Sequence, residues 1–160
     1  MARQLLHLLD GQLEIESAQD IRRPFGLVLS LRVIEHVPVL VVDDNADTLQ
    51  LFQRYLAGTR YLFMGTRDPL DALRLAETNR PRVILLDVML PGMDGWQVLQ
   101  RLLHAPSTQK TPVIVCSILP EEQLALAMGA ARYLRKPVSQ TDLLAALDQE
   151  MGEKGQEPPA

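Results

Sequence analysis

The sequence is poor in cysteine, with a single one, Cys116, among its 160 residues. One cysteine cannot close an internal disulfide, and the histidines do not combine with it at the spacing of a zinc site. Because Cys116 lies inside an apolar run, we expect a small buried side chain there rather than a redox centre. The shortage of cysteine therefore favours a reducing, cytoplasmic setting.

An excess of basic charge and long hydrophobic runs are also missing. The formal net charge is −4, whereas modules that bind nucleic acid usually carry a clustered basic face, so we expect no direct nucleic-acid binding. No apolar segment approaches the roughly 20 residues that span a bilayer, and the N-terminus has no signal-peptide pattern, so we expect no membrane association. With 47% hydrophobic and 22% charged residues, the composition is that of a globular domain.

What the sequence does contain is a regular alternation of two patterns. Apolar runs rich in β-branched residues predict strands at 37–42, 61–65, 82–86, 112–116 and 132–135. Helical spacing of apolar residues predicts helices at 47–57, 68–78, 95–103, 120–128 and 140–151. This alternation predicts an α/β fold, a doubly wound five-stranded parallel sheet with helices on both faces.

Polar residues with reactive chemistry stand where the predicted strands end. Asp43 and Asp44 follow the first strand, Asp87 the third, Ser117 the fourth and Lys136 the fifth. The carboxyl ends of parallel strands share one edge of the sheet, so these side chains should converge. Three crowded carboxylates need a cation, and a hard divalent ion such as Mg²⁺ prefers oxygen ligands. A carboxylate that lies next to both Mg²⁺ and the Lys136 ammonium could attack a phosphoryl group. Ser117 could then donate a hydrogen bond to the new phosphate.

These motifs resemble the signature of the CheY-like receiver domains of response regulators in two-component signal transduction. The resemblance rests on Asp43-Asp44, the stretch DVMLPGMDG at 87–95, Ser117 and Lys136-Pro137, and it covers residues 37–151. It implies a flavodoxin-like receiver fold without enzyme activity. It also implies that Asp87 accepts a phosphoryl group from a histidine kinase or phosphotransfer protein.

The resemblance further implies a role for each residue of the site. Asp43, Asp44, Asp87 and the backbone carbonyl of Met89 would hold Mg²⁺. Ser117 and Lys136 would contact the phosphoryl group.

Two features of the segment from Ser117 to Pro137 also follow from the resemblance. Tyr133 would be the switch aromatic that turns inward when Ser117 moves toward the phosphate. The Lys136–Pro137 peptide bond would be cis.

One departure from the family pattern stands beside the expected phosphate. Ile118 follows Ser117, where receiver domains usually have a small side chain, and Met89 lies two residues past the acceptor. Two apolar side chains there would screen the acyl phosphate from water. We therefore expect slow autodephosphorylation.

Residues 1–36 form a separate N-terminal extension in this interpretation. Residues 1–9 predict a helix, and alternating apolar and polar residues in 12–16 and 25–33 predict a β-hairpin. The stretches GQLEIES and FGLVL resemble the closing strands of histidine-kinase-type ATPase domains. We interpret the extension as the remnant of a fused kinase module or a dimerisation element, because an isolated hairpin exposes unpaired edges that a second chain could satisfy.

The polar residues 152–160 predict a flexible tail. They are too few for an output module. We therefore expect phosphorylation to act through an unknown downstream protein that binds in trans, or through the N-terminal extension.

Two other functions remain open at this point. The first is a structural receiver-like domain that works without phosphorylation, which the loss of an acidic residue or of the lysine would favour. The second is an aspartyl-phosphate phosphatase of the haloacid-dehalogenase type. Such enzymes carry two aspartates two residues apart on one strand, whereas Asp43 and Asp44 are adjacent and Asp87 has Met89 at that offset.

Overall fold

The computed structural model describes residues 12–16, 26–30 and 35–153. The chain divides into two compact units, Met1–Glu35 and His36–Ala160. The boundary lies one residue before the predicted one. Among the helices in the described residues, none combines the length and the apolar character needed to cross a membrane.

The first unit contains the predicted hairpin. Strands β1 (Gln12–Glu16) and β2 (Gly26–Ser30) pair in antiparallel fashion, with Leu13 opposite Leu29 and Ile15 opposite Leu27. Strand β1 matches the predicted 12–16, and β2 lies within the predicted 25–33, whose remaining residues are outside the described ones. The helix expected over 1–9 lies outside the described residues.

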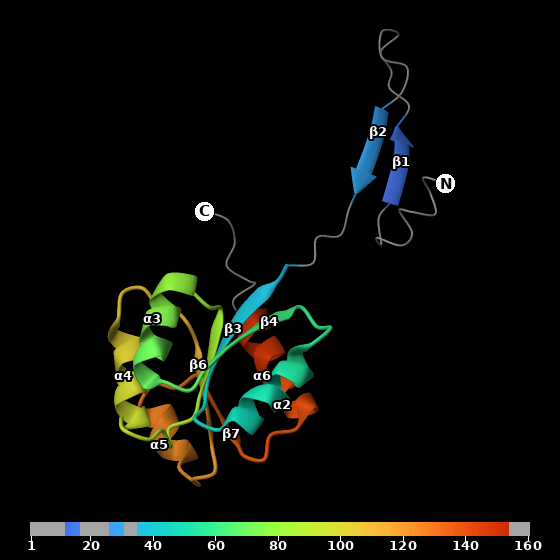
Figure 1. The fold of residues 1–160 in the computed structure, drawn as a ribbon. Helices are drawn as coiled ribbons and strands as arrows, with labels where there is room; N and C mark the ends of the chain where they lie inside the picture. The colour runs from blue at the N-terminus through green and yellow to red at the C-terminus, as the bar shows by residue number, and fades with distance from the viewer. Residues whose placement is uncertain (1–11, 17–25, 31–34, 154–160) are drawn as a thin grey trace. The chain divides into compact units, whose positions relative to one another are not determined.

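A five-stranded parallel sheet forms the centre of the second unit (Figure 1). Its strand order is β4-β3-β5-β6-β7, and every neighbouring pair is parallel. The strands are β3 (Val37–Val42), β4 (Tyr61–Thr66), β5 (Val83–Leu86), β6 (Val113–Ser117) and β7 (Arg132–Arg135). All five follow the predicted runs within one residue at each end.

Five helices connect or follow these strands: α2 (Ala46–Leu56), α3 (Pro69–Asn79), α4 (Gly95–His104), α5 (Glu122–Ala127) and α6 (Gln140–Glu153). The first three begin where a polar side chain accepts a hydrogen bond from the second helical residue. These caps are Asn45, Asp68 and Asp94. Such caps satisfy backbone N–H groups that the first turn leaves without partners.

The helices cover both faces of the sheet, with α3, α4 and α5 on one face and α2 and α6 on the other (Figure 1). Side chains alternate between the two faces along a strand, so each strand contributes to two cores. Leu40 and Ile84 pack beneath the first group of helices, and Val39 and Leu85 beneath the second. The predicted α/β fold is therefore confirmed.

Two helix ends differ from the predictions. Helix α5 is shorter than the predicted 120–128, because Glu121 supplies no side-chain cap and Gly129 has a left-handed φ of 99°. Helix α6 continues to Glu153, two residues into the segment that we expected to be a tail.

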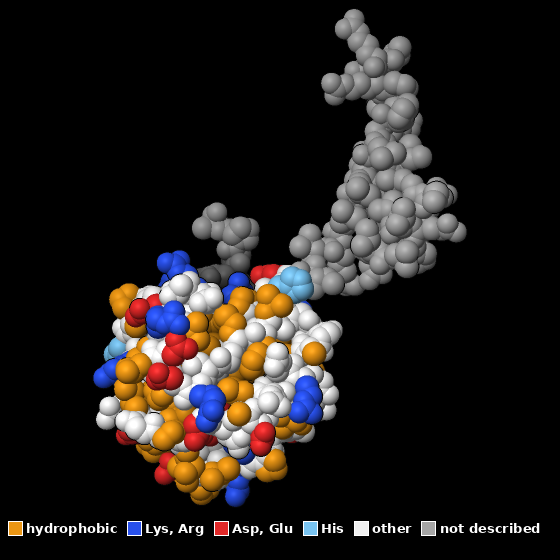
Figure 2. Space-filling view, in the orientation of Figure 1, with side chains coloured by type: hydrophobic (Ala, Val, Ile, Leu, Met, Phe, Trp, Pro, Cys, Tyr) orange, Lys and Arg blue, Asp and Glu red, His pale blue; other side chains and the backbone are white. Residues whose placement is uncertain are grey.

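Charged side chains of both signs are interspersed over the face seen in Figure 2, with hydrophobic side chains between them. That face therefore presents no continuous patch of one sign.

Candidate functional site

The site forms where the chain reverses its direction of travel across the sheet. From β3 the chain moves outward to β4, the edge strand, and then returns to β5 on the other side of β3. The crossover helices leave a crevice at the carboxyl ends of strands placed in this way. Val42 pairs with Leu86, and the Asp87 N–H donates to the Val42 carbonyl at 2.9 Å, so Asp43 and Asp87 leave neighbouring strands side by side.

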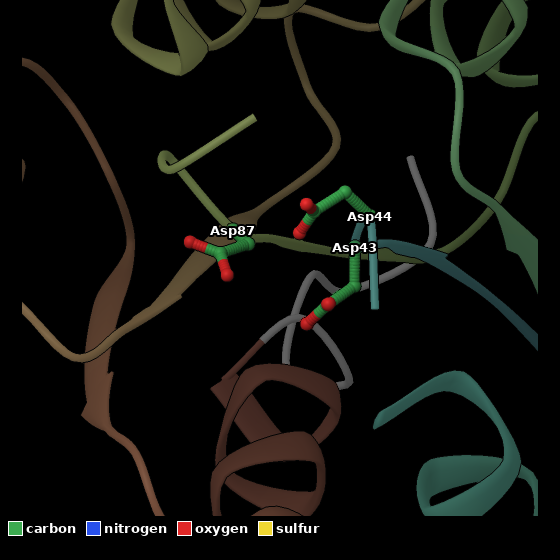
Figure 3. Close-up of side chains that lie close together, drawn as sticks. All are labelled: Asp43, Asp44 and Asp87. Carbon is green, nitrogen blue, oxygen red and sulfur yellow. The ribbon is translucent and has the colours of Figure 1, made fainter. Parts of the chain in front are cut away.

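Three carboxylates meet at this point. One oxygen from each of Asp43, Asp44 and Asp87 lies within 4.8 Å of the other two, and Figure 3 shows the three side chains close together. Asp43 and Asp87 are buried, with 2% and 6% of their surface exposed, whereas Asp44 is partly exposed. An oxygen-only cluster of this charge fits a hard divalent cation, so these residues could hold a metal ion.

Lys136 joins two of the three carboxylates. Its Nζ donates to Asp43 Oδ2 at 2.6 Å and also to Asp87 Oδ2. Burial by itself lowers the pKa of Lys136, but the hydrogen bonds and charges of Asp43 and Asp87 outweigh it and raise the pKa above its ordinary value. Lys136 is therefore an ammonium at neutral pH.

The carboxylate of Asp43 has a perturbed pKa. Burial raises the pKa of Asp43 above its usual value, although hydrogen bonds from Lys136 and the Asn45 N–H favour the charged form. A bound divalent cation would favour the charged form further, since opposite charges stabilise a carboxylate.

Backbone N–H groups fix the orientation of the two buried carboxylates. Asp43 Oδ1 accepts from the Asn45 N–H at 2.9 Å, and Asp87 Oδ1 accepts from the Met89 N–H at 2.8 Å. In both residues Oδ1 is held by the loop and Oδ2 by Lys136. This repeated arrangement turns both carboxylates toward the same ammonium.

A close contact fixes the loop that carries Asp87. A Cβ built on Gly95, the first residue of α4, would lie 2.3 Å from Val88 Cα and 2.4 Å from the Val88 carbonyl oxygen. Only glycine permits this approach. The start of α4 therefore holds the backbone of the residue after Asp87.

Ser117 and Tyr133 lie on the neighbouring strands β6 and β7. Ser117 is fully buried, and its Oγ accepts a hydrogen bond from the Leu119 N–H at 3.3 Å. The Tyr133 hydroxyl donates to the Leu119 carbonyl and lies 3.2 Å from the carbonyl oxygen of Ser117. Burial raises the pKa of Tyr133. Tyr133 thus contacts the loop that begins with Ser117.

The structure brings together Asp43, Asp44, Asp87 and Lys136, as the sequence predicted. The Lys136–Pro137 bond is cis, also as predicted. The ligand role of the Met89 carbonyl stays a prediction. Sequence reasoning missed Arg67, whose Nε donates to the Asp44 carbonyl at 2.7 Å; its place directly after the second strand was the available signal.

Comparison with known proteins identifies the family of this chain. A family model described as the response regulator receiver domain matches residues 39–148. The transcriptional regulatory protein HprR of Escherichia coli is 38% identical over 110 residues, which are 67% of this chain and 48% of HprR. This chain belongs to the response regulator receiver domain family, and it spans about half the length of that relative.

Solved structures show the same fold. The chemotaxis response regulator CheY4 of Vibrio cholerae is 27% identical, with a TM-score of 0.67 over 72% of this chain and 98% of CheY4. The receiver domain of the sensor histidine kinase PA1611 of Pseudomonas aeruginosa is 26% identical, with a TM-score of 0.67 over 73% of this chain and 98% of that domain. That receiver domain was solved with a magnesium ion coordinated in its active site cleft.

Proposed function

We propose that this chain is a phosphoacceptor that takes a phosphoryl group on Asp87 from a histidine kinase or a phosphotransfer protein. The observation that carries the proposal is the Lys136 ammonium between Asp43 and Asp87, at an edge where three carboxylates meet. Lys136 carries one positive charge against three carboxylates. The additional negative charge makes the site suitable for a cation.

In the proposed reaction, an oxygen of Asp87 forms a bond to phosphorus. The bond between phosphorus and the donor's imidazole nitrogen breaks, and the imidazole leaves with the electron pair. Lys136 moves its hydrogen bond from the Asp87 carboxylate to an oxygen of the phosphoryl group, where it stabilises the negative charge. Asp43 stays in place because the Asn45 N–H holds its other oxygen.

Mg²⁺, when bound, would neutralise the carboxylates and draw charge from the transferring oxygens. Asp43, Asp44 and Asp87 would hold it, together with the Met89 carbonyl. The chemistry of the donor set supports this assignment, since all these ligands are oxygens.

The switch would pass through Ser117 and Tyr133. Ser117 Oγ could donate to a phosphate on Asp87, which would change the loop 117–121 that Tyr133 contacts. The affected surface comprises α5, β7 and α6, where Leu124 and Leu126 are exposed hydrophobic side chains. This surface would bind a downstream protein in trans, so the domain would act as a signalling switch rather than as an enzyme.

Intact mass measurement after incubation with Mg²⁺ and acetyl phosphate tests the proposal. We expect the native chain to gain the mass of one phosphoryl group and Asp87→Asn to gain none. Asp44→Asn is a second variant, which keeps the acceptor and should be phosphorylated more slowly because one metal ligand is weakened. No adduct on the native chain would favour the alternative, a receiver-like interaction domain that works without phosphorylation.

A further inference from the structure

Arg67 lies beside the acidic loop without belonging to the predicted site. It directly follows β4, whose last residue, Thr66, pairs with Val42 at the end of β3. The Asp43 N–H donates to the Thr66 carbonyl at 3.2 Å, and Arg67 Nε donates to the Asp44 carbonyl at 2.7 Å. Two hydrogen bonds therefore join the end of β4 and the residue after it to the segment that carries Asp43 and Asp44.

The three carboxylates are held in different ways. Asp43 and Asp87 are buried, and each accepts hydrogen bonds from a backbone N–H and from Lys136. Asp44 is partly exposed. The Arg67 bond holds the peptide plane after Asp44, and the Asp43 to Thr66 bond holds the backbone just before it. Together they restrict the backbone from which the Asp44 side chain projects.

We propose that Arg67 is a positioning residue of the metal site. Through its hydrogen bond to the Asp44 carbonyl, it keeps the Asp44 carboxylate within reach of the cation that Asp43 and Asp87 also hold. The inference rests on the proposed function, because it concerns the same site.

The charge of Arg67 makes the proposal easy to separate from a simple electrostatic effect. A guanidinium near a cation site repels the cation. If charge were its only effect, removing the guanidinium would therefore tighten Mg²⁺ binding. Removing a group that orients a ligand weakens metal binding, by about 10–100-fold for outer-shell partners. The two effects have opposite signs.

Isothermal titration calorimetry with MgCl₂ on the full chain is the test. We compare the native chain with Arg67→Met, which keeps an apolar stem but removes the donor and the charge. The matched control is Arg74→Met, because Arg74 is also exposed and lies seven residues further along, on α3, but it pairs with Asp71 instead. We expect about 10-fold weaker Mg²⁺ binding for Arg67→Met and unchanged binding for Arg74→Met.

Arg67→Lys is the second variant, since it keeps the charge and a donor that can reach the same carbonyl. The Mg²⁺ affinity of Arg67→Lys should lie between those of the native chain and Arg67→Met. If Arg67→Met has a lower thermal unfolding midpoint in the absence of Mg²⁺, Arg67→Lys becomes the deciding variant. Equal or tighter binding by the Arg67 variants would overturn the inference while leaving the proposed function intact. Absence of Mg²⁺ binding by the native chain would instead contradict the proposed function.

Discussion

At the scale of single residues, the site depends on one ammonium between two buried carboxylates, with a third carboxylate nearby. Lys136 contacts Asp43 and Asp87 directly, so its positive charge offsets part of theirs. Burying such a pair is costly unless the partners are also hydrogen-bonded, and the N–H groups of Asn45 and Met89 supply those bonds. The remaining negative charge is what a divalent cation would neutralise.

Ile118 should lengthen the life of the phosphorylated state. Ile118, which follows Ser117, is 59% exposed, and Met89, two residues after Asp87, is 45% exposed. Both residues are therefore accessible, and we expect them to cover a phosphoryl group on Asp87. We expect Ile118→Ala to lose phosphate about 3-fold faster, which corresponds to a barrier lower by ~0.6 kcal/mol. Phosphate release after loading with acetyl phosphate measures this rate.

The control for Ile118→Ala is Leu62→Ala, which truncates a 46% exposed leucine on β4. Its release rate should equal that of the native chain. Slower release from Ile118→Ala than from the native chain would refute the screening role.

Tyr61 should make the stability sensitive to alkaline pH. Burial, with a hydrogen bond from its hydroxyl to Asp148 at 2.5 Å, raises the pKa of Tyr61 to about 12, against about 10 in an unfolded chain. The folded state therefore keeps a proton that the unfolded state loses above pH ~10. The resulting stability is fully present below that pH and is lost as the pH rises toward the folded pKa.

Urea unfolding at pH 8 and pH 11 checks this effect. The loss of stability between the two should be about 1 kcal/mol smaller for Tyr61→Phe than for the native chain, a modest figure because Arg60 and Asp148 beside it are exposed to water. Other groups titrate alike in both proteins. Equal losses in the two proteins would contradict the assignment.

At the scale of elements, the contact between α4 and the loop that carries Asp87 is the closest that an added Cβ would meet at any described glycine. Gly95→Ala would place a methyl group within 2.6 Å of three backbone atoms of Val88. Because backbone atoms cannot rotate away as a side chain can, we expect about 2–3 kcal/mol of destabilisation. The displaced loop should also weaken Mg²⁺ binding.

Gly152→Ala is the matched control for Gly95→Ala, since a Cβ at Gly152 of α6 meets nothing within 4 Å. Alanine favours helix over glycine, so this variant should be no less stable than the native chain. Denaturant unfolding measures both variants. A Gly95→Ala protein as stable as Gly152→Ala would show that α4 can move away from the loop without cost.

Helix α5 is the least supported element of the proposed switch surface. It spans six residues, has no side-chain cap and exposes Leu124 and Leu126. Gln100 of α4 holds its C-terminal end, because Gln100 Nε2 donates to the Met128 carbonyl at 2.9 Å. A short element with few buried contacts is suited to change its position at small cost in free energy.

At the scale of the whole molecule, the chain joins a receiver unit with its own two cores to a two-stranded hairpin. An isolated hairpin is at best marginally stable in water. Its register places Leu13 opposite Leu29 and Ile15 opposite Leu27, so alternate pairs of the hairpin are aliphatic. A strand pair with aliphatic residues at alternate positions normally packs against another layer of secondary structure.

We therefore predict that the full chain forms a homodimer through residues 1–36. Light scattering should give a dimer for the native chain and a monomer for Ile15→Pro, because proline removes an N–H and disfavours the interior of a strand. Circular dichroism should show the receiver unit of this variant still folded. A monomeric native chain would be the contrary result.

Much of the fold followed from local patterns. The five strands were predictable because each is a short apolar run that ends in polar or turn residues, and three helix starts carried a capping side chain. The ends of α5 and α6 were less predictable. Helix α5 begins at Glu122 without a side-chain cap. Gly152 favours a stop after Met151, but α6 continues through it to Glu153.

The sequence by itself determined which residues can perform the chemistry: three aspartates, a serine and a lysine, each at the end of a predicted strand. Tertiary structure decided how they meet. Lys136 reaches Asp43 across 93 residues of chain and Asp87 across 49, and Arg67 reaches the Asp44 carbonyl across 23. These contacts depend on strand order and register, which local patterns do not encode, because packing of the whole sheet sets which strand ends become neighbours.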